Sequence, residues 1–314
     1  MGSAYANLLV EQPKYDIEAG LRAEYTHVRY AISEENIYYS PSVDSYGYFN
    51  LFPNVRFTYK VNSAHRLSLF YNKRIDRPGE GDLRIFPKYD DPELLKVGNP
   101  YLRPQYTQNV ELAYKFIWGG GSVFVAGYHK MIDDSFTRIY AIDERDTGQD
   151  IINKVYQNVG KSTNTGVEMV FDQQLASYWT LSGSVNWYRN RIKAYNGIMY
   201  FPYERPFAIE ATADSPWYAK LNSQLSVWKD MKIQLSGSYF AAKSTVQGKE
   251  LSRWGVDMGV KKPFCNGRLE LMLSATDLFN TMGIRQEING DGFRALYENF
   301  YETQLLSIGV KVKL

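Results

Sequence analysis

The side chains that could carry out acid–base or metal chemistry are few and far apart in the sequence. The chain has 314 residues but only three histidines, His27, His65 and His129, and one cysteine, Cys265. A hydrolytic site needs a histidine beside a carboxylate or a nucleophile, and a zinc site needs several ligands at short spacing. The sequence contains no such grouping, so we expect no catalytic residue, no metal site and no cofactor.

Two acidic segments, residues 143–146 and 289–292, have the composition of calcium ligands. A calcium loop also needs oxygen ligands at alternate positions and a closing glutamate, and neither segment has them. We interpret both segments as solvated loops.

Composition excludes other classes of function. The net charge is only +2 and acidic and basic residues are interspersed, which predicts no nucleic-acid partner. The chain contains no run of about 18 apolar residues, so a transmembrane helix is excluded. Aromatic residues nevertheless make up 15% of the chain, including 26 tyrosines. That content is high for a soluble domain and needs a structural explanation.

The dominant pattern is the alternation of apolar and polar residues with a period of two, which is typical of β-strands. Leu181, Val185 and Trp187 share one face of their segment with Gly183, whereas the opposite face carries two serines and an asparagine. The same alternation holds around Leu21, because Arg22 and Glu24 lie on the opposite face of their strand. The apolar stripes often end in tyrosine or tryptophan, as they do where membrane β-barrels cross the lipid interfaces.

The connections between the predicted strands alternate between short and long. We expect strands over residues 4–11, 14–32, 48–61, 65–75, 105–117, 122–138, 154–173, 178–193, 211–227, 231–242, 250–262, 267–281 and 300–314. The long connectors are residues 33–47, 76–104, 139–153, 194–210, 243–249 and 282–299. Short turns at one end and long loops at the other are typical of outer-membrane barrels, with the short turns on the periplasmic side. The sequence therefore predicts an all-β, antiparallel, up-and-down transmembrane β-barrel.

A soluble all-β binding module, such as a carbohydrate-binding domain, is the alternative interpretation. Its strands would show the same alternation, but its apolar faces would meet in a dry core. The two interpretations differ in where Leu21, Leu112, Trp187 and Ile308 point. A membrane barrel directs such residues outward into a lipid-facing band about 25 Å tall.

Several ordered segments resemble one protein family. The segments are residues 15–26, 51–55, 71–78, 98–104 (Gly-Asn-Pro-Tyr-Leu-Arg-Pro), 158–160 with 166–168, and 277–281 (Asp-Leu-Phe-Asn-Thr). Together they resemble the outer-membrane β-barrel family found at the carboxy end of TonB-dependent transporters. The sequence departs from the family pattern at Gln105, at residues 82–86 and at Leu314.

The resemblance implies a function and partners. Complete family members have about 22 strands and an amino-terminal plug domain that contacts TonB. The chain would then lie in the outer membrane of a Gram-negative cell and import a large nutrient, either a glycan, a metal chelate or a peptide. Its partners would be outer-membrane lipid, the plug domain, TonB and, in some systems, an accessory surface lipoprotein.

The odd number of expected strands suggests that residues 1–314 form an amino-terminally truncated barrel domain. Complete bacterial barrels have an even number of strands with both ends in the periplasm. Residues 1–5 also lack the basic start and apolar core of a signal peptide, and nothing in the sequence resembles a plug domain.

Two groups of residues are candidates for function. The charged side chains on the polar strand faces are expected to line the lumen, where they would contact a plug domain or influence what passes. These residues are Arg22, Glu24, Arg66, Glu111, Lys115, Glu168, Lys220, Arg253, Asp257, Arg268 and Glu270. The longest connector, residues 76–104, is the expected place of ligand contact because loops of this length are often functional. Its candidates are Arg77, Asp82, Arg84, Tyr89, Asp90, Tyr101 and Arg103.

Overall fold

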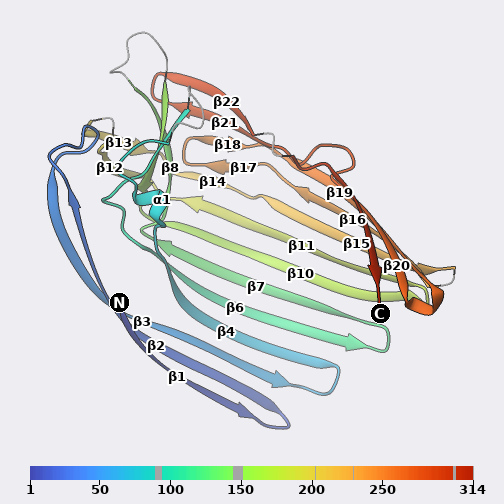
Figure 1. Ribbon diagram of the computed structural model, residues 1–314. Helices are drawn as coiled ribbons and strands as arrows, with labels where there is room; N and C mark the ends of the chain where they lie inside the picture. Colours follow the sequence, from blue (N-terminus) through green and yellow to red (C-terminus); the bar gives the residue numbers. More distant parts are fainter. Residues whose placement is uncertain (89–93, 144–150, 202, 229, 300–301, 314) are drawn as a thin grey trace.

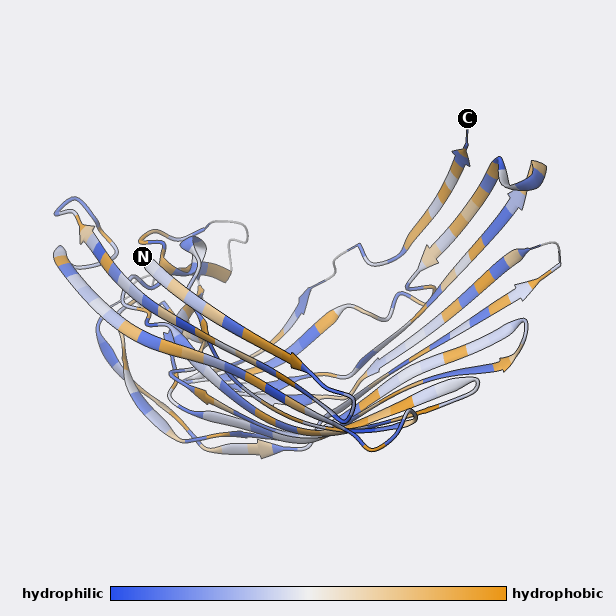
Figure 2. Cartoon of the chain, turned by 90° about the horizontal axis from the view of Figure 1, so that it is seen from below, coloured by the Kyte–Doolittle hydropathy of each residue, from blue (hydrophilic) through white to orange (hydrophobic). Residues whose placement is uncertain are grey.

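The computed structural model describes residues 1–88, 94–143, 151–201, 203–228, 230–299 and 302–313. Within these residues the chain forms one large antiparallel sheet of 14 strands and three smaller sheets. The large sheet curves into an open trough (Figure 2), with its first and last strands on opposite rims. The fold class predicted from the alternation is confirmed.

The long strands follow the chain order along the large sheet. They are β1 (Gly2–Glu11), β2 (Tyr15–Ile32), β3 (Ser42–Lys60), β4 (His65–Asp76), β6 (Gln105–Trp118), β7 (Gly121–Asp133), β10 (Ser162–Ala176), β11 (Trp179–Ile192), β15 (Trp217–Val227), β16 (Met231–Phe240), β19 (Arg253–Phe264), β20 (Leu269–Thr276) and β23 (Leu305–Val312). The short strand β14 (Thr212–Asp214) pairs beside β11. Each expected strand corresponds to one of the long strands in this order.

The apolar stripes lie on the outer surface of the sheet. Leu21, Leu112, Trp187 and Ile308 are 47%, 61%, 51% and 70% exposed, and none of them belongs to a buried cluster. A soluble sandwich would bury these side chains against a second sheet. The soluble binding module is therefore wrong, and the band of exposed apolar residues has the form of a lipid-facing surface.

Two of the expected strands divide at a single residue with positive φ. The expected strand 122–138 is split at Asp134 (φ 53°) into β7 and β8 (Phe136–Ile142). The expected strand 154–173 is split near Gly160 (φ 78°) into β9 (Ile152–Asn158) and β10. The left-handed conformation is favourable for glycine and tolerated by aspartate, and it turns the chain out of the large sheet at these points.

All of the long connectors except residues 33–47 contribute strands to small sheets at one end of the trough (Figure 1). One contains β5 (Leu94–Val97), β9 and β8, and another is the hairpin of β12 (Tyr195–Met199) and β13 (Arg205–Ile209). The third contains β17 (Lys243–Thr245), β18 (Gly248–Glu250), β21 (Ile284–Gly290) and β22 (Phe293–Asn299). The helical elements of the described residues are the single turns α1 (Glu80–Leu83) and η1 (Cys265–Gly267).

The buried apolar core of the described residues lies in this loop end. One cluster contains Ile32, Tyr39, Leu95, Val97, Val155 and Phe201, and two smaller clusters join the other loop strands. The wall of the trough and its loop end are thus stabilised differently. The loop end has a packed interior like that of a soluble domain, whereas the wall presents most of its large apolar side chains outward.

The segment Asp277–Thr281 forms a turn that ends β20 one residue before Asp277, so the expected strand 267–281 is too long. Asp277 is 2% exposed and has φ 44°. Its carboxylate accepts hydrogen bonds from the backbone of Thr281 (2.9 Å) and Met282 (3.1 Å) and from the hydroxyl of Thr303 (2.6 Å). Its own backbone amide donates to Asp257 at 2.8 Å.

Replacement of Asp277 tests this turn. Burial by itself would raise the pKa of Asp277, but its hydrogen bonds outweigh burial and lower the pKa below the usual value. The ionised form therefore stabilises the fold above about pH 4, and this stabilisation is lost as pH falls through the lowered pKa. We expect Asp277→Ala to lower the free energy of unfolding in detergent by about 2 kcal/mol at pH 7. The exposed Asp291→Ala is the control, and equal effects of the two substitutions would contradict this role.

Candidate functional site

The polar strand faces line the concave side of the trough. Side chains on a concave face converge, so they are less exposed than those on the convex face. Glu24, Asn109 and Asn186 are 3%, 9% and 5% exposed, in contrast to Leu112 on the opposite face of β6. The strand registers place the other predicted lumen residues of β4, β6, β10, β15, β19 and β20 on this same face. Arg268 differs because it lies in the turn before β20.

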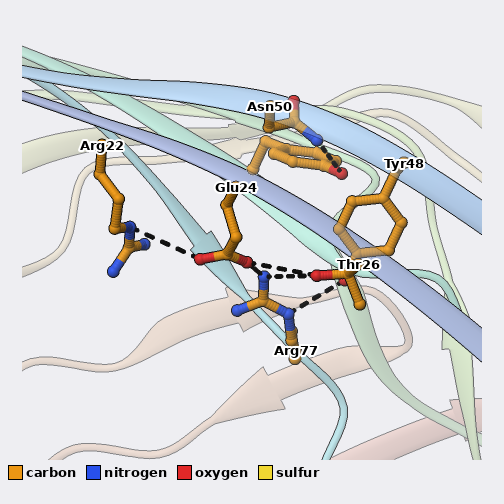
Figure 3. Close-up of polar contacts among 7 residues, drawn as sticks. Arg22, Glu24, Thr26, Tyr48, Asn50 and Arg77 are labelled. Carbon is orange, nitrogen blue, oxygen red and sulfur yellow. Dashed lines mark hydrogen bonds and ion pairs between the residues drawn. The ribbon is translucent and has the colours of Figure 1, made fainter. Parts of the chain in front are cut away.

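A polar network centred on Glu24 occupies the concave side near the loop end (Figure 3). The carboxylate of Glu24 forms an ion pair with Arg77 and a longer one with Arg22, at 3.5 Å. Arg77 also donates to the hydroxyls of Tyr48 (3.0 Å) and Thr26 (3.5 Å). Arg77, which was predicted as a ligand contact, is therefore held against the wall by the side chains of β2 and β3.

A cavity that we call the tyrosine cleft lies at the loop end of the trough. It is a cavity of about 650 Å³. Its lining consists of Tyr30, Ser42, Asp44, Asn99, Tyr101, Arg103, Gln157, Asn158, Tyr195, Gly197, Ile198, Tyr200 and Phe207. This volume is within the range of small-molecule binding sites.

Two asparagines hold the segment 98–104 in place beneath the cleft. Asn99 donates to the backbone of Tyr156 (3.0 Å) and accepts from the amide of Tyr101 (2.9 Å). Asn158 accepts from the amide of Arg103 (2.9 Å) and donates to its carbonyl (3.0 Å). These contacts join two of the segments that carried the family resemblance, residues 98–104 and 158–160.

Aromatic rings and a paired charge form the surface of the cleft. The rings of Tyr101 and Tyr200 lie 4.4 Å apart, and Tyr30 meets Tyr101 edge-on at 6.1 Å. Asp44 accepts a hydrogen bond from Tyr30 (3.2 Å) and lies 3.7 Å from Arg103. Burial, followed by the hydrogen bond to Asp44, raises the pKa of Tyr30 to about 12. Tyr30 therefore remains a neutral hydrogen-bond donor at physiological pH.

Three lining residues have unused hydrogen-bonding capacity. The Oγ of Ser42, the Nη1 of Arg103 and the Nε2 of Gln157 are buried and have no hydrogen-bond partner among the described residues. Buried polar groups are normally satisfied, and an unsatisfied group often marks a position for water or ligand. Aromatic faces combined with such groups can stack on and hydrogen-bond to a polar ligand.

The structure separates the other predicted loop candidates from the tyrosine cleft. Tyr101 and Arg103 line it, whereas Asp82 accepts from the amide of Gly79 (2.9 Å) at α1 and Arg84 lies over the ring of Phe86. Tyr89 and Asp90 fall outside the described residues. The cleft residues Tyr30, Asp44 and Tyr200 were not predicted. Tyr30 lies in the expected strand 14–32, and Asp44 and Tyr200 lie in the connectors 33–47 and 194–210, whose several tyrosines are the signal that could have indicated them.

The histidines lie on three different strands, β2, β4 and β7, and two of them contact neighbouring hydroxyls. His65 lies 2.6 Å from the hydroxyl of Tyr114, and His129 lies 2.7 Å from that of Thr165. No group of three or more His, Cys, Asp or Glu side chains in the described part of the chain could hold a metal ion. No helix in the same residues is both long and apolar enough to cross a membrane.

Comparison with known proteins connects this architecture to one family. The model of the outer membrane protein beta-barrel family matches residues 1–311. No curated protein matches the chain.

Solved structures with the same fold are similar over nearly the whole chain. The copper transporter OprC superimposes with a TM-score of 0.66 at 12% identity, covering 98% of this chain and 46% of that one. The siderophore receptor PiuA from Acinetobacter baumannii has a TM-score of 0.64 at 16% identity, with 98% and 42% covered. The ferric yersiniabactin uptake receptor FyuA from Yersinia pestis has a TM-score of 0.60 at 14% identity, with 98% and 44% covered. The chain thus spans less than half the length of these proteins.

Removing Arg77 tests the polar network in the trough. Arg77→Ala leaves the buried carboxylate of Glu24 with only the longer contacts to Arg22 (3.5 Å) and to the hydroxyl of Thr26 (3.4 Å), so we expect a loss of about 2 kcal/mol in the free energy of unfolding. Adding Glu24→Gln to this variant removes the uncompensated charge and should restore part of the loss. Chemical denaturation of the four proteins of this double-mutant cycle provides the measurement. Additive effects of the two substitutions would contradict the pairing.

Proposed function

The chain belongs to the outer membrane protein beta-barrel family, and from this we propose that it is the barrel part of a TonB-dependent transporter that imports a large polar nutrient through the cell outer membrane. The nutrient is a glycan, a metal chelate or a peptide. The observation that carries the proposal is the combination of an outward-facing apolar wall with a ligand-sized cleft at its loop end.

The position of the tyrosine cleft supports a role in ligand capture. Long loops of outer-membrane barrels face the exterior, so a ligand arriving from outside meets this end first. The tyrosine rings, the Asp44–Arg103 pair and the unsatisfied polar groups suit a ligand with both flat apolar faces and hydroxyl or carboxylate groups. We propose that Tyr101 and Arg103 make direct contact with it.

The edges of the trough support the proposal that the chain is one portion of a larger wall. Among the described residues, β1 pairs only with β2, and β23 pairs only with β20. An edge strand in hydrocarbon leaves amide and carbonyl groups without partners, at several kcal/mol for each group. We propose that further strands pair with both edges in the membrane and close the wall into a barrel.

The concave face supports the proposal that a plug domain and TonB are partners in the transport cycle. A closed barrel of about 22 strands leaves a wide lumen that a plug must fill. The charged and polar concave side chains could form hydrogen bonds to such a domain, whereas the neutral residues between them, including the buried Ala113 and Ala126, allow close approach. An accessory surface lipoprotein is a further proposed partner at the loop end.

Ligand binding by the refolded chain tests the proposed role of the cleft. Labelled oligosaccharides, ferric chelates and oligopeptides would be titrated against the detergent-solubilised protein. We expect one of these classes to bind, and Tyr101→Ala to weaken its binding by about tenfold through loss of the stacking face and its contact with Tyr200.

Tyr25→Ala is the matched control because it removes the same side chain from the exposed convex face. It should leave binding unchanged. Failure of all three ligand classes to bind, or equal losses in both variants, would contradict the proposed role of the tyrosine cleft.

A further inference from the structure

A second cavity, of about 330 Å³, brings three basic side chains together at the loop end. It lies between the sheet of β5, β9 and β8 and the sheet that contains β21 and β22. Its basic residues are Lys96, Arg138 and Lys154, and Glu287 is the carboxylate in its described lining. It shares no lining residue with the tyrosine cleft.

Lys154 is the most buried of these cations. The residue is only 5% exposed, and its ammonium lies 5.3 Å from the ring centre of Tyr140 and 4.8 Å from that of Tyr297. Within the described residues its ammonium makes no hydrogen bond or ion pair. The two aromatic rings offset only part of the hydration energy that a buried ammonium loses. The ammonium of Lys154 can therefore still donate hydrogen bonds to an anion.

The neighbouring cations, Arg138 and Lys96, strengthen the attraction of this site for an anion. Burial, followed by the charges of Arg138 and Lys96, lowers the pKa of Lys154 to about 8. Burial removes water from the ammonium of Lys154, and the two neighbouring positive charges disfavour its charged form further. An anion would relieve both the repulsion and the missing hydrogen bonds.

Two residues that line the cavity, Tyr140 and Gln247, are joined by hydrogen bonds that do not involve its cations. The backbone amide of Tyr140 donates to the side chain of Gln247 (2.7 Å), and Gln247 donates back to the carbonyl of Tyr140 (2.9 Å). This reciprocal pair connects β8 to the connector between β17 and β18. The cavity volume lies at the lower end of the range for ligand sites, which suits a small ligand.

We propose that this cavity is an oxyanion site that binds a sulfate or phosphate group, either as the free ion or on a monosaccharide-sized ligand. Lys154 and Arg138 contact the anion, and Lys96 contributes positive potential. Gln286, Asn299 and the hydroxyl of Tyr297 supply hydrogen-bonding groups around the anion. The proposal is independent of which nutrient the tyrosine cleft receives.

Equilibrium dialysis with radiolabelled sulfate tests the site in the detergent-solubilised chain, at constant ionic strength maintained with chloride. We expect saturable binding by the unsubstituted protein and at least about tenfold weaker binding by Lys154→Met. The control is Lys130→Met, because the ammonium of Lys130 also lies over a tyrosine, Tyr128, at 4.9 Å, but outside this cavity. No saturable binding, or equal affinity of Lys154→Met and the unsubstituted protein, would overturn the proposal.

The pH dependence of sulfate binding by the unsubstituted protein provides a second test, and it does not depend on whether a substituted protein folds. Sulfate keeps its double charge between about pH 6 and pH 10, so a change in affinity reports on the protein. The charged or titratable groups facing Lys154 are Arg138, Lys96, Glu287, Tyr140 and Tyr297. Burial raises the pKa of Tyr140 to about 12, so that side chain stays neutral over this range. Affinity should fall as pH rises beyond about 8, and a flat profile to about pH 10 would overturn the role of Lys154.

Competition distinguishes the two sources of the oxyanion. Inorganic phosphate and glucose 1-phosphate would each be used to displace labelled sulfate, with glucose as the neutral comparison. Equal displacement by the two phosphates assigns the site to a free ion, and stronger displacement by glucose 1-phosphate assigns it to a sugar-sized ligand. Displacement by glucose alone, or by neither phosphate, would overturn the proposal.

Discussion

In the hydrocarbon of a membrane, backbone amides and carbonyls have no water to bond with, so each must find a partner within the protein. Between its two edges, the long antiparallel sheet meets this constraint strand by strand, from the pairing of β1 with β2 to that of β20 with β23. Once the backbone is satisfied, one face of the sheet can be entirely apolar. The exposed Leu112 and Ile308, and the charged residues on the opposite face, follow from the same period-two geometry.

The loop end is stabilised by a different interaction, the burial of apolar side chains. There the chain can bury apolar residues in a packed interior, and the cluster around Val155 and Phe201 does so. This interior supports both cavities described above, because it fixes the strands from which their side chains project. The tyrosine cleft combines aromatic faces with polar groups of mixed charge, whereas the smaller cavity concentrates positive charge. The two cavities therefore select ligands of different chemistry.

The sequence predicted the wall of the trough better than its loop end. Alternation is a local signal, so each long strand was identified in order. Alternation does not reveal a single residue with a left-handed backbone conformation, which is why the breaks at Asp134 and Gly160 were missed. The strands β5, β8 and β9 are buried on both faces and show no alternation. Tyr101 and Arg103 came from the longest connector, but Tyr30 and Tyr200 meet Tyr101 only because distant segments pack together, around the buried cluster that contains Tyr39 and Phe201.

The direction of the two strand faces is the central claim, and spin-label accessibility tests it most directly. Cysteines would be placed singly along β6, from Val110 to Lys115, in a Cys265→Ser background, and the labelled protein would be reconstituted into lipid. Lipid-soluble oxygen should accelerate the spin relaxation of labels at 110, 112 and 114. A water-soluble nickel complex should accelerate that of labels at 111, 113 and 115. Loss of this alternation, or its reversal so that position 111 meets lipid, would contradict the assignment of the convex face to the membrane.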